Sequence, residues 1–219
     1  MAVSLRHGTY GNYYGNDYNS SNALTQEQME VNATYIYSYL SAKGWSINAI
    51  AGILGNMQHE SAINPGRWEG NDVGNGPGYG LVQWTPYTNY TNWCSTQGYS
   101  DPSEMDNNLS RIIYELENGL QYIKTSNYPE SFSEFTKSNQ SPYYLACAFA
   151  WNYERSAVVL WGTEAEREAL RQLRGGSANK WYTYLTGVEP SDPTPTPGVT
   201  TKKKKFNWIL FNPRRRLRK

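Results

Sequence analysis

Residues 46–65 read SINAIAGILGNMQHESAINP, and this stretch decides the fold because it describes one strongly apolar helix. Ser46 is suited to cap the start of the helix, and Asn64-Pro65 ends it because the residue before a proline disfavours helical backbone. Apolar side chains recur between these two points at the helical spacings of three and four. They are Ile47, Ile50, Ile53, Leu54 and Met57.

The end of this helix carries a candidate acid. Glu60 follows Met57 by three residues, so helical geometry places its carboxyl on the apolar face. Loss of hydration there disfavours the charged form of a carboxyl, and a general acid must hold its proton near neutral pH. The alternative is an ordinary surface glutamate near a helix end. His59 points about 100° away around the helix, so we do not expect it to act as a base. Ser61 is expected to support the local hydrogen bonding.

Four further helices are predicted outward from this one. The first begins at Thr25, with Gln28 in the capping-box position, and ends at Gly44. A long helix fits residues 103–124, with its apolar stripe buried. Ser141-Pro142 introduces an apolar helix over residues 143–153. A last helical stretch covers residues 163–185, broken at Gly175-Gly176 and then resumed.

The chain divides into four segments on this pattern. Residues 1–23 are a leader rich in Gly, Asn and Tyr, without the periodicity of a regular element. Residues 24–187 are the helical domain, residues 188–201 a linker rich in Pro and Thr, and residues 202–219 a basic, aromatic tail. Within the domain, residues 66–84 are predicted to form a small β-hairpin region. The predicted fold class is therefore mainly α, of the α+β kind, with this β region directly after the helix that carries Glu60.

Charge and composition exclude several classes of function. The tail holds nine of the 20 Lys and Arg residues and no acid, so the rest of the chain carries 11 cations against 19 Asp and Glu. A body charge of −8 argues against nucleic acid as its ligand. Cys94 and Cys147 do not have metal-ligand spacing, and a buried free thiol is favoured over a disulfide. We therefore expect no metal and no cofactor. The start of the chain does not have a signal-peptide pattern, and no run of about 20 apolar residues predicts a membrane span.

Three motifs in order carry a family resemblance: residues 59–65 (HESAINP), residues 80–85 (GLVQWT) and residues 148–153 (AFAWNY). This ordered set resembles goose-type lysozymes and soluble lytic transglycosylases, whose Glu-Ser, Gly-Leu-x-Gln and Ala-Tyr-Asn motifs surround one catalytic glutamate. Residues 49–57 (AIAGILGNM), leading into Glu60-Ser61, are more similar to the phage tail lysozyme family. The resemblance covers roughly residues 24–187 and implies a lysozyme-like fold.

The resemblance also implies roles for individual residues. Glu60 matches the catalytic acid, and Gln83 matches a glutamine near the substrate. Asn152 matches the asparagine of the third motif, which would hold an N-acetyl group or a water. That motif reads Trp-Asn-Tyr here in place of Ala-Tyr-Asn, so Tyr153 is one candidate for the role of the family tyrosine. The aromatic residues of the second motif region, Tyr79 and Trp84, are further candidates for substrate binding.

A second carboxylate decides between two reactions. A hydrolase often uses one to bind water or to stabilise an oxocarbenium-like state. Asp72 and Glu69 are the candidates, with Asp72 preferred because its Gly- and Asn-rich surroundings predict exposure; the alternative for Asp72 is a turn-forming role. Without a second acid, attack by the sugar's own 6-hydroxyl would give the anhydro product of a lytic transglycosylase.

The predicted function is cleavage of peptidoglycan between N-acetylmuramic acid and N-acetylglucosamine by a phage virion-associated tail lysin. Alternatives are a free endolysin released at the cell wall and, from another class, a non-catalytic virion structural or glycan-binding protein. Bacterial peptidoglycan is the expected partner, together with other phage tail proteins. The tail, in which apolar residues 206–211 lie between two basic clusters, is suited to an anionic membrane, to teichoic acid or to an acidic groove on a virion protein.

Overall fold

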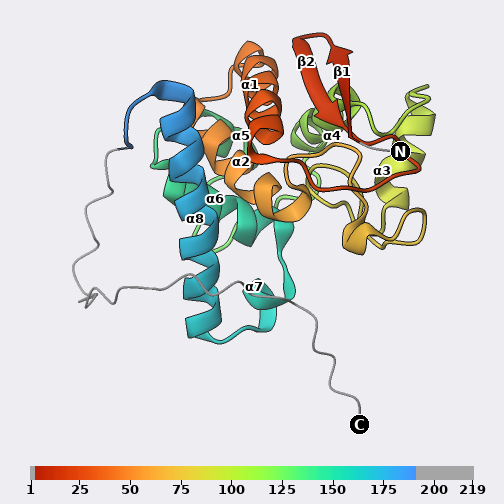
Figure 1. The fold of residues 1–219 in the computed structure, drawn as a ribbon. Helices are drawn as coiled ribbons and strands as arrows, with labels where there is room; N and C mark the ends of the chain where they lie inside the picture. The colour runs from red at the N-terminus through yellow and green to blue at the C-terminus, as the bar shows by residue number, and fades with distance from the viewer. Residues whose placement is uncertain (1–2, 191–219) are drawn as a thin grey trace.

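The computed structural model describes residues 3–190, which form eight α-helices and one two-stranded antiparallel sheet (Figure 1). The predicted mainly α fold class is confirmed. The linker beyond residue 190 and the basic tail lie outside the described residues. The helices are α1 (Gln26–Ala42), α2 (Ile47–Ser61), α3 (Thr88–Thr96), α4 (Met105–Glu117), α5 (Phe132–Lys137), α6 (Pro142–Phe149), α7 (Ala157–Trp161) and α8 (Glu164–Thr186).

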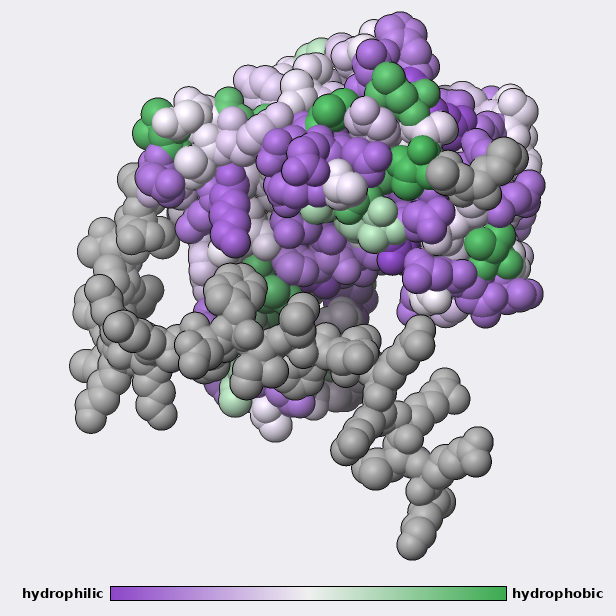
Figure 2. Space-filling view, in the orientation of Figure 1, coloured by the Kyte–Doolittle hydropathy of each residue, from purple (hydrophilic) through white to green (hydrophobic). Residues whose placement is uncertain are grey.

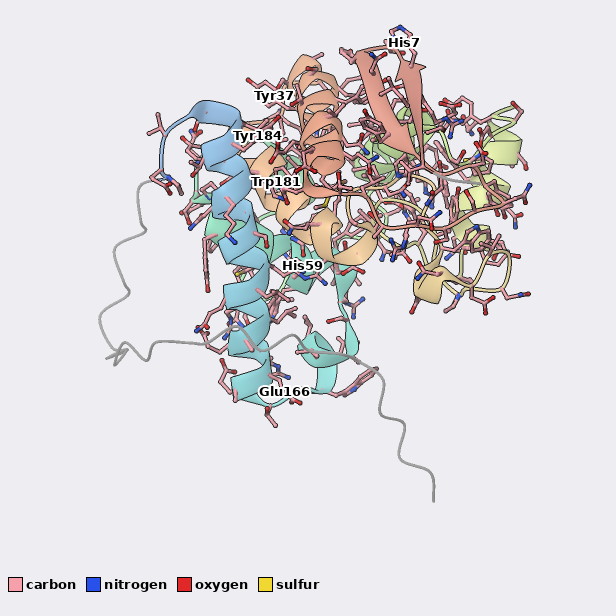
Figure 3. The ribbon with its side chains drawn as sticks, viewed as in Figure 1. His7, Tyr37, His59, Glu166, Trp181 and Tyr184 are labelled. Carbon is pink, nitrogen blue, oxygen red and sulfur yellow. The ribbon has the colours of Figure 1, made fainter. Side chains whose placement is uncertain are left out.

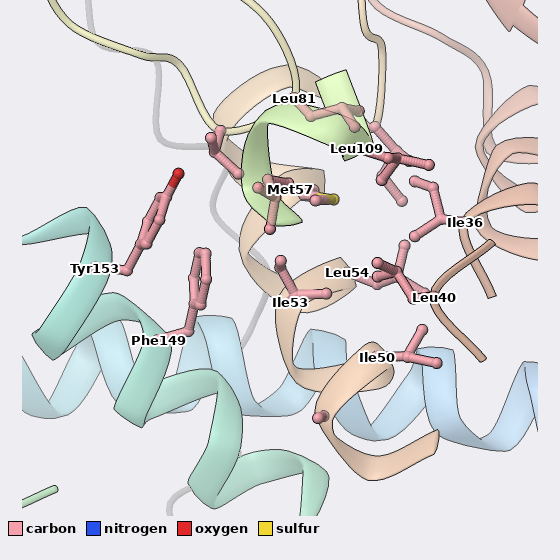
Figure 4. Close-up of a cluster of buried hydrophobic side chains, with 14 of the residues drawn as sticks. Ile36, Leu40, Ile50, Ile53, Leu54, Met57, Leu81, Leu109, Phe149 and Tyr153 are labelled. Carbon is pink, nitrogen blue, oxygen red and sulfur yellow. The ribbon is translucent and has the colours of Figure 1, made fainter. Parts of the chain in front are cut away.

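Helix α2 lies at the centre of the molecule and packs against α1, α6 and α8. Its side chain Ile53 is completely buried, as are Leu40 of α1 and Leu109 of α4 (Figure 4). Burial of one such side chain contributes about 1.5–3 kcal/mol. Two glycines on α2 permit the close packing: a Cβ on Gly55 would lie 2.7 Å from the backbone oxygen of Arg174, and one on Gly52 would lie 3.0 Å from the backbone nitrogen of Ala146. The predicted apolar helix is thus the core of the fold.

The start of the chain contains the sheet, which contradicts the expectation that the leader, residues 1–23, has no regular element. β1 (Ser4–Gly8) pairs with β2 (Gly11–Gly15) in an antiparallel hairpin beside α1. Tyr13 is completely buried, and Asn32 of α1 binds the Tyr14 backbone on both sides, accepting from its nitrogen and donating to its oxygen at 2.8 Å. The many glycines and asparagines of this segment give it no alternation of apolar and polar residues that would predict strands. The hairpin is stabilised instead by side chains of other elements, such as Asn32.

The segment after α2 has less β structure than predicted. Residues 66–84 contain the 3-10 turn η1 (Glu69–Asn71) and two isolated bridges, Trp68 with Tyr79 and Tyr79 with Trp84. Asn108 of α4 holds the bend that follows by accepting a hydrogen bond from the Leu81 nitrogen at 3.0 Å. The segment is therefore shaped mainly by turns and by side chains of neighbouring helices.

Two of the predicted helices differ from the structure, one in where it ends and one in whether it is broken. Helix α4 ends at Glu117, and Gly119 and Gln121 adopt positive φ angles of 62° and 64°, so Leu120 and Ile123 are exposed rather than part of a buried stripe. Helix α8, in contrast, runs through Gly175-Gly176 without a break. A Cβ on Gly175 would lie 2.3 Å from the Tyr143 ring, so this glycine provides space for a neighbouring helix.

The surface is mostly hydrophilic on the face shown in Figure 2, with apolar side chains in separate patches. Among residues 3–190, no helix is long and apolar enough to cross a membrane. Both cysteines, Cys94 and Cys147, are buried and unbridged. Burial raises the pKa of the Cys147 thiol to about 12, so this thiol is protonated at neutral pH.

Candidate active site

A cavity of about 540 Å³ opens where the end of α2 meets the segment after it, α4 and the end of α6. Its wall is rich in ionisable groups. The carboxyl groups are those of Glu60, Glu69, Glu115 and Glu154; the basic groups are Arg67, Arg111 and His59; the remaining polar and aromatic contributors include Gln83, Trp84, Gln121 and Tyr153. Four carboxyls in one cavity make a site able to hold and move protons.

Glu60 reaches this cavity from the last turn of α2, and its side chain is 21% exposed. One carboxylate oxygen accepts a hydrogen bond from Arg174 of α8. Arg174 is fixed in place because its other terminal nitrogen donates to the backbone oxygen of Asn56 at 2.7 Å. Glu60 is thus accessible from the cavity and oriented by a cation from another helix.

Glu115 of α4 lies at the buried side of the cavity and is 2% exposed. It accepts hydrogen bonds from Trp84 Nε1 at 3.0 Å, from Arg111 Nε at 2.9 Å and from the Tyr153 hydroxyl. Burial raises the pKa of Glu115, and these three donors oppose that shift by stabilising its charged form. The Glu115 carboxylate thus links Trp84 of the second sequence motif to Tyr153 of the third, and both of its oxygens accept hydrogen bonds.

Glu154 ends the π-helical turn η2 (Ala150–Glu154), which continues directly from α6. Its Oε1 atom is buried and has no hydrogen-bond partner among the described residues. Burial is the main cause that raises its pKa well above the ordinary value; the nearby Glu60 charge adds to the shift, and Arg174 opposes it. Glu154 is therefore a weaker acid than an ordinary glutamate.

The wall opposite α2 comes from the segment that contains the second motif. Gln83 donates through Nε2 to the backbone oxygens of Arg67 at 3.0 Å and Gly80 at 2.8 Å. Its buried Oε1 has no partner in the part of the chain that the structure describes. Glu69 Oε2 and Gln83 Oε1 lie 2.7 and 3.2 Å from the point that a Cβ on Gly78 would occupy, so the two side chains are neighbours. Arg67 has a buried terminal nitrogen that also has no partner among the described residues.

The two residues that flank Glu60 have structural contacts. Ser61 donates to the Leu81 backbone oxygen at 2.9 Å, which ties the end of α2 to the second motif, and local support of this kind was predicted. His59 lies beside α8, with Nε2 2.8 Å from Ser177 Oγ (Figure 3). Although His59 as a whole residue is exposed, desolvation of its ring and the charge of Arg174 lower its pKa to about 4. His59 is therefore neutral at neutral pH.

The structure brings some of the predicted site residues together and places others elsewhere. Glu60, Gln83, Trp84 and Tyr153 all line the cavity. Three others are not among its lining residues: Asp72, Tyr79 and Asn152. Asp72 is exposed and shapes a turn, with its backbone oxygen accepting from the Gly76 nitrogen at 2.7 Å.

The other two residues outside the cavity are completely buried. Tyr79 packs against Trp68, with ring centroids 4.7 Å apart. Asn152 donates to the Tyr128 backbone oxygen at 2.8 Å and accepts from Thr125 Oγ1 at 2.9 Å. These contacts anchor the segment before α5, so both residues support the cavity wall from behind.

Five charged residues at the site were not singled out from the sequence: Arg67, Arg111, Glu115, Glu154 and Arg174. Glu154 directly follows the third motif, which is the one local signal that pointed to it. Arg174 is 114 residues from its partner Glu60 in the chain, and Glu115 is 38 residues from Tyr153. Pairings over such distances are set by the packing of helices, so a reading of local patterns does not find them.

A helical body around a buried central helix, with a carboxyl-rich cavity at the end of that helix, defines a protein of the lysozyme-like class. Residues 31–185 match the phage tail lysozyme family, and the chain belongs to this family. It is also 44% identical over 171 residues to Morphogenesis protein 1 of Bacillus phage B103. That alignment covers 78% of this chain and 43% of the relative, so the chain spans less than half the length of that protein.

Proposed function

We propose that this protein cleaves the glycan strand of peptidoglycan between N-acetylmuramic acid and N-acetylglucosamine, with Glu60 as the proton donor to the leaving oxygen. The observation that carries the proposal is the position of Glu60, which ends a buried helix and opens into a cavity lined by three more carboxyls. Glycoside cleavage needs an acid on one side of the bond and, in a hydrolase, a second carboxyl on the other. Membership of the phage tail lysozyme family supports this chemistry.

Glu69 is better placed than Asp72 to be the second carboxyl, because it lines the cavity beside Gln83 whereas Asp72 lies in an exposed turn. In this proposal Glu69 binds the attacking water. Attack by water leaves a normal reducing end on the product. Attack by the sugar's 6-hydroxyl would leave an anhydro end, and neither Glu69 nor Asp72 would then be needed.

Substrate binding is proposed for the atoms of the cavity wall whose hydrogen bonding is incomplete. The unpartnered Oε1 of Gln83 can accept from an acetamido N–H, and the unpartnered nitrogen of Arg67 can donate to a carbonyl or carboxylate of the substrate. Trp84 and Tyr153 contribute their rings to the same wall. Asn152 and Tyr79 act indirectly in this scheme, by holding the backbone behind the cavity.

The test is glycan cleavage by the wild type and by Glu60→Gln, measured on purified cell walls and on soluble fragments. We expect the wild type to release fragments, and the Gln variant to lose at least about 100-fold in rate, because an amide cannot deliver a proton. Binding to walls without cleavage by either protein would favour the non-catalytic structural alternative. Mass spectrometry of the product ends then separates hydrolase from transglycosylase.

We propose that the protein is part of the phage virion and that it cleaves the cell wall when the phage genome enters the host. The name of the relative, a morphogenesis protein, favours a virion protein over a free endolysin. Detection of the chain in purified particles would support this proposal, and its presence only in the lysate would favour the endolysin. Deletion of residues 202–219 should preserve cleavage of soluble fragments and weaken binding to walls, anionic vesicles or particles, because the tail supplies nine cations.

A further inference from the structure

The charges around Glu60 do not balance. Arg174 pairs with Glu60, and Arg111 pairs with Glu115. Glu154 lines the same cavity as Glu60 and Glu115, and among residues 3–190 no Lys, Arg or His forms an ion pair with it. Among the described residues, Arg174 is the cation that forms an ion pair with Glu60, and its charge also acts on Glu154.

The geometry makes Glu154 a poor place for a second negative charge. Its Oε1 is buried and receives no hydrogen bond from the described residues, and an unpaired charge in such a place is costly. The charged groups that act on it are Glu60 from α2, Arg174 from α8 and Glu115 from α4. Two of these three are acids, so they also disfavour its ionisation. One proton shared by Glu60 and Glu154 makes the group of these two acids and Arg174 neutral.

We propose that Glu60 and Glu154 hold one proton between them, and that Glu154 is a positioning residue which keeps this proton in the cavity for Glu60. In the resting arrangement the proton is on Glu154, while ionised Glu60 pairs with Arg174. In the reactive arrangement the proton has moved to Glu60, and Glu154 carries the charge near Arg174. This inference rests on the proposed function, because it explains how an acid paired with an arginine still serves as a proton donor.

The proton balance of one turnover closes within this pair. Glu60 gives its proton to the glycosidic oxygen as the bond from that oxygen to the sugar carbon breaks. The attacking water bonds to that carbon and releases one proton, which returns to the pair. The products are one sugar chain with the protonated leaving oxygen and one with the new hydroxyl, and the pair again holds one proton.

The first test is the pH dependence of cleavage of soluble glycan fragments by the wild type, Glu154→Gln and Glu154→Asp. When two acids share one proton, this proton leaves the pair only in the second, higher titration step. The Gln variant has no such second step, so its alkaline limb should move to lower pH by about one unit or more, a tenfold lower rate at a given alkaline pH. Its rate at acid pH should remain within about twofold of the wild type, and Asp should restore much of the wild-type profile.

The matched control is Glu117→Gln, the same chemical change at an exposed position at the end of α4. Its profile should match that of the wild type. If Glu154→Gln lowers the rate by the same factor at every pH, or leaves the profile unchanged, Glu154 has a structural role only and the proposal is wrong. A shift of the alkaline limb to higher pH would also overturn it.

The second test does not depend on activity. Carbon-13 NMR of the glutamate carboxyls in the intact chain follows titration directly in the wild type and in Glu60→Gln. We expect Glu154 to titrate at lower pH in Glu60→Gln, because the like charge is removed and Arg174 is released to pair with it. An unchanged Glu154 titration would overturn the shared proton. A wild type that cleaves no glycan but shows the coupled titration would refute the proposed function and leave the shared proton supported.

Discussion

The close approach of α2 and α8 predicts opposite effects for the same substitution at two glycines. In Gly55→Ala the new Cβ would lie 2.7 Å from the Arg174 backbone oxygen and 2.8 Å from the Ala178 backbone nitrogen. In Gly176→Ala, on α8, nothing lies within 4 Å of the new atom. Both positions are inside helices, where alanine in place of glycine contributes about 1 kcal/mol of stability. The two variants therefore differ only in whether the methyl group has space.

The expected magnitude at Gly55 follows from what the methyl group contacts. Overpacking costs about 1–3 kcal/mol, and the upper end applies here because backbone atoms have no alternative rotamer. After the gain in helix propensity, Gly55→Ala should lose about 2 kcal/mol, which lowers the melting temperature by about 4–8 °C in a chain of this size. Gly176→Ala should gain about 1 kcal/mol and melt about 2–4 °C higher.

Calorimetry or circular dichroism of the three proteins measures these shifts. Because the clash falls on the backbone of Arg174, Gly55→Ala should also disturb the ion pair with Glu60, and its glycan cleavage should fall further than that of Gly176→Ala. A Gly55→Ala protein that melts at or above the wild-type temperature would refute the reasoning. It would mean that α2 and α8 are not in contact at this position.

Three further outcomes are expected. Glu60→Gln should abolish cleavage while melting within a few degrees of the wild type, as circular dichroism will show; retained activity would contradict the assignment of the proton donor. Glu69→Gln should lower turnover at least about tenfold, and Asp72→Asn by less than about twofold, in assays of reducing-end release; the reverse order would restore Asp72 as the second carboxyl. Burial raises the pKa of Glu154, so the folded state binds this proton more tightly than the unfolded state. The contribution of Glu154 to the free energy of unfolding should be fully present below about pH 4.5 and fall as the pH rises through the folded pKa, so urea denaturation should show a smaller fall over this range in Glu154→Gln.

Four helix starts, those of α1, α2, α6 and α8, were predictable from the sequence because capping is a local interaction. The Thr25 side chain accepts from the Gln28 nitrogen, and Thr163 from the Glu166 nitrogen, each in the predicted capping box. Ser46 caps α2, and Ser141 caps α6 ahead of its first-turn proline. Each of these contacts spans three residues, so the pattern of residues that makes the contact is visible in the sequence itself.

The errors concern features that depend on distant partners. The strand that contains Tyr13 is held by Asn32 of α1, and Tyr13 itself is covered by the Tyr35 ring 5.3 Å away. Gly175 looks like a helix break in the sequence, yet it is the place where Tyr143 packs onto α8. The candidate acid was found from two local signals, its place on the apolar face of a helix and the sequence motif around it. Its cation was not, because Arg174 comes from a helix that only the fold brings near.

The π-helical turn η2 connects the buried helix α6 to the wall of the cavity. A regular α-helix continued from α6 would advance 100° per residue, whereas a π turn accommodates one additional residue and changes the direction of the side chains that follow. In this turn Tyr153 donates its hydroxyl to Glu115, and Glu154 lines the cavity near Glu60. Arg155, with a φ of 48°, then ends the turn. The π turn thus places the Glu154 carboxyl in the same cavity as Glu60, directly after a helix that is fixed by the core.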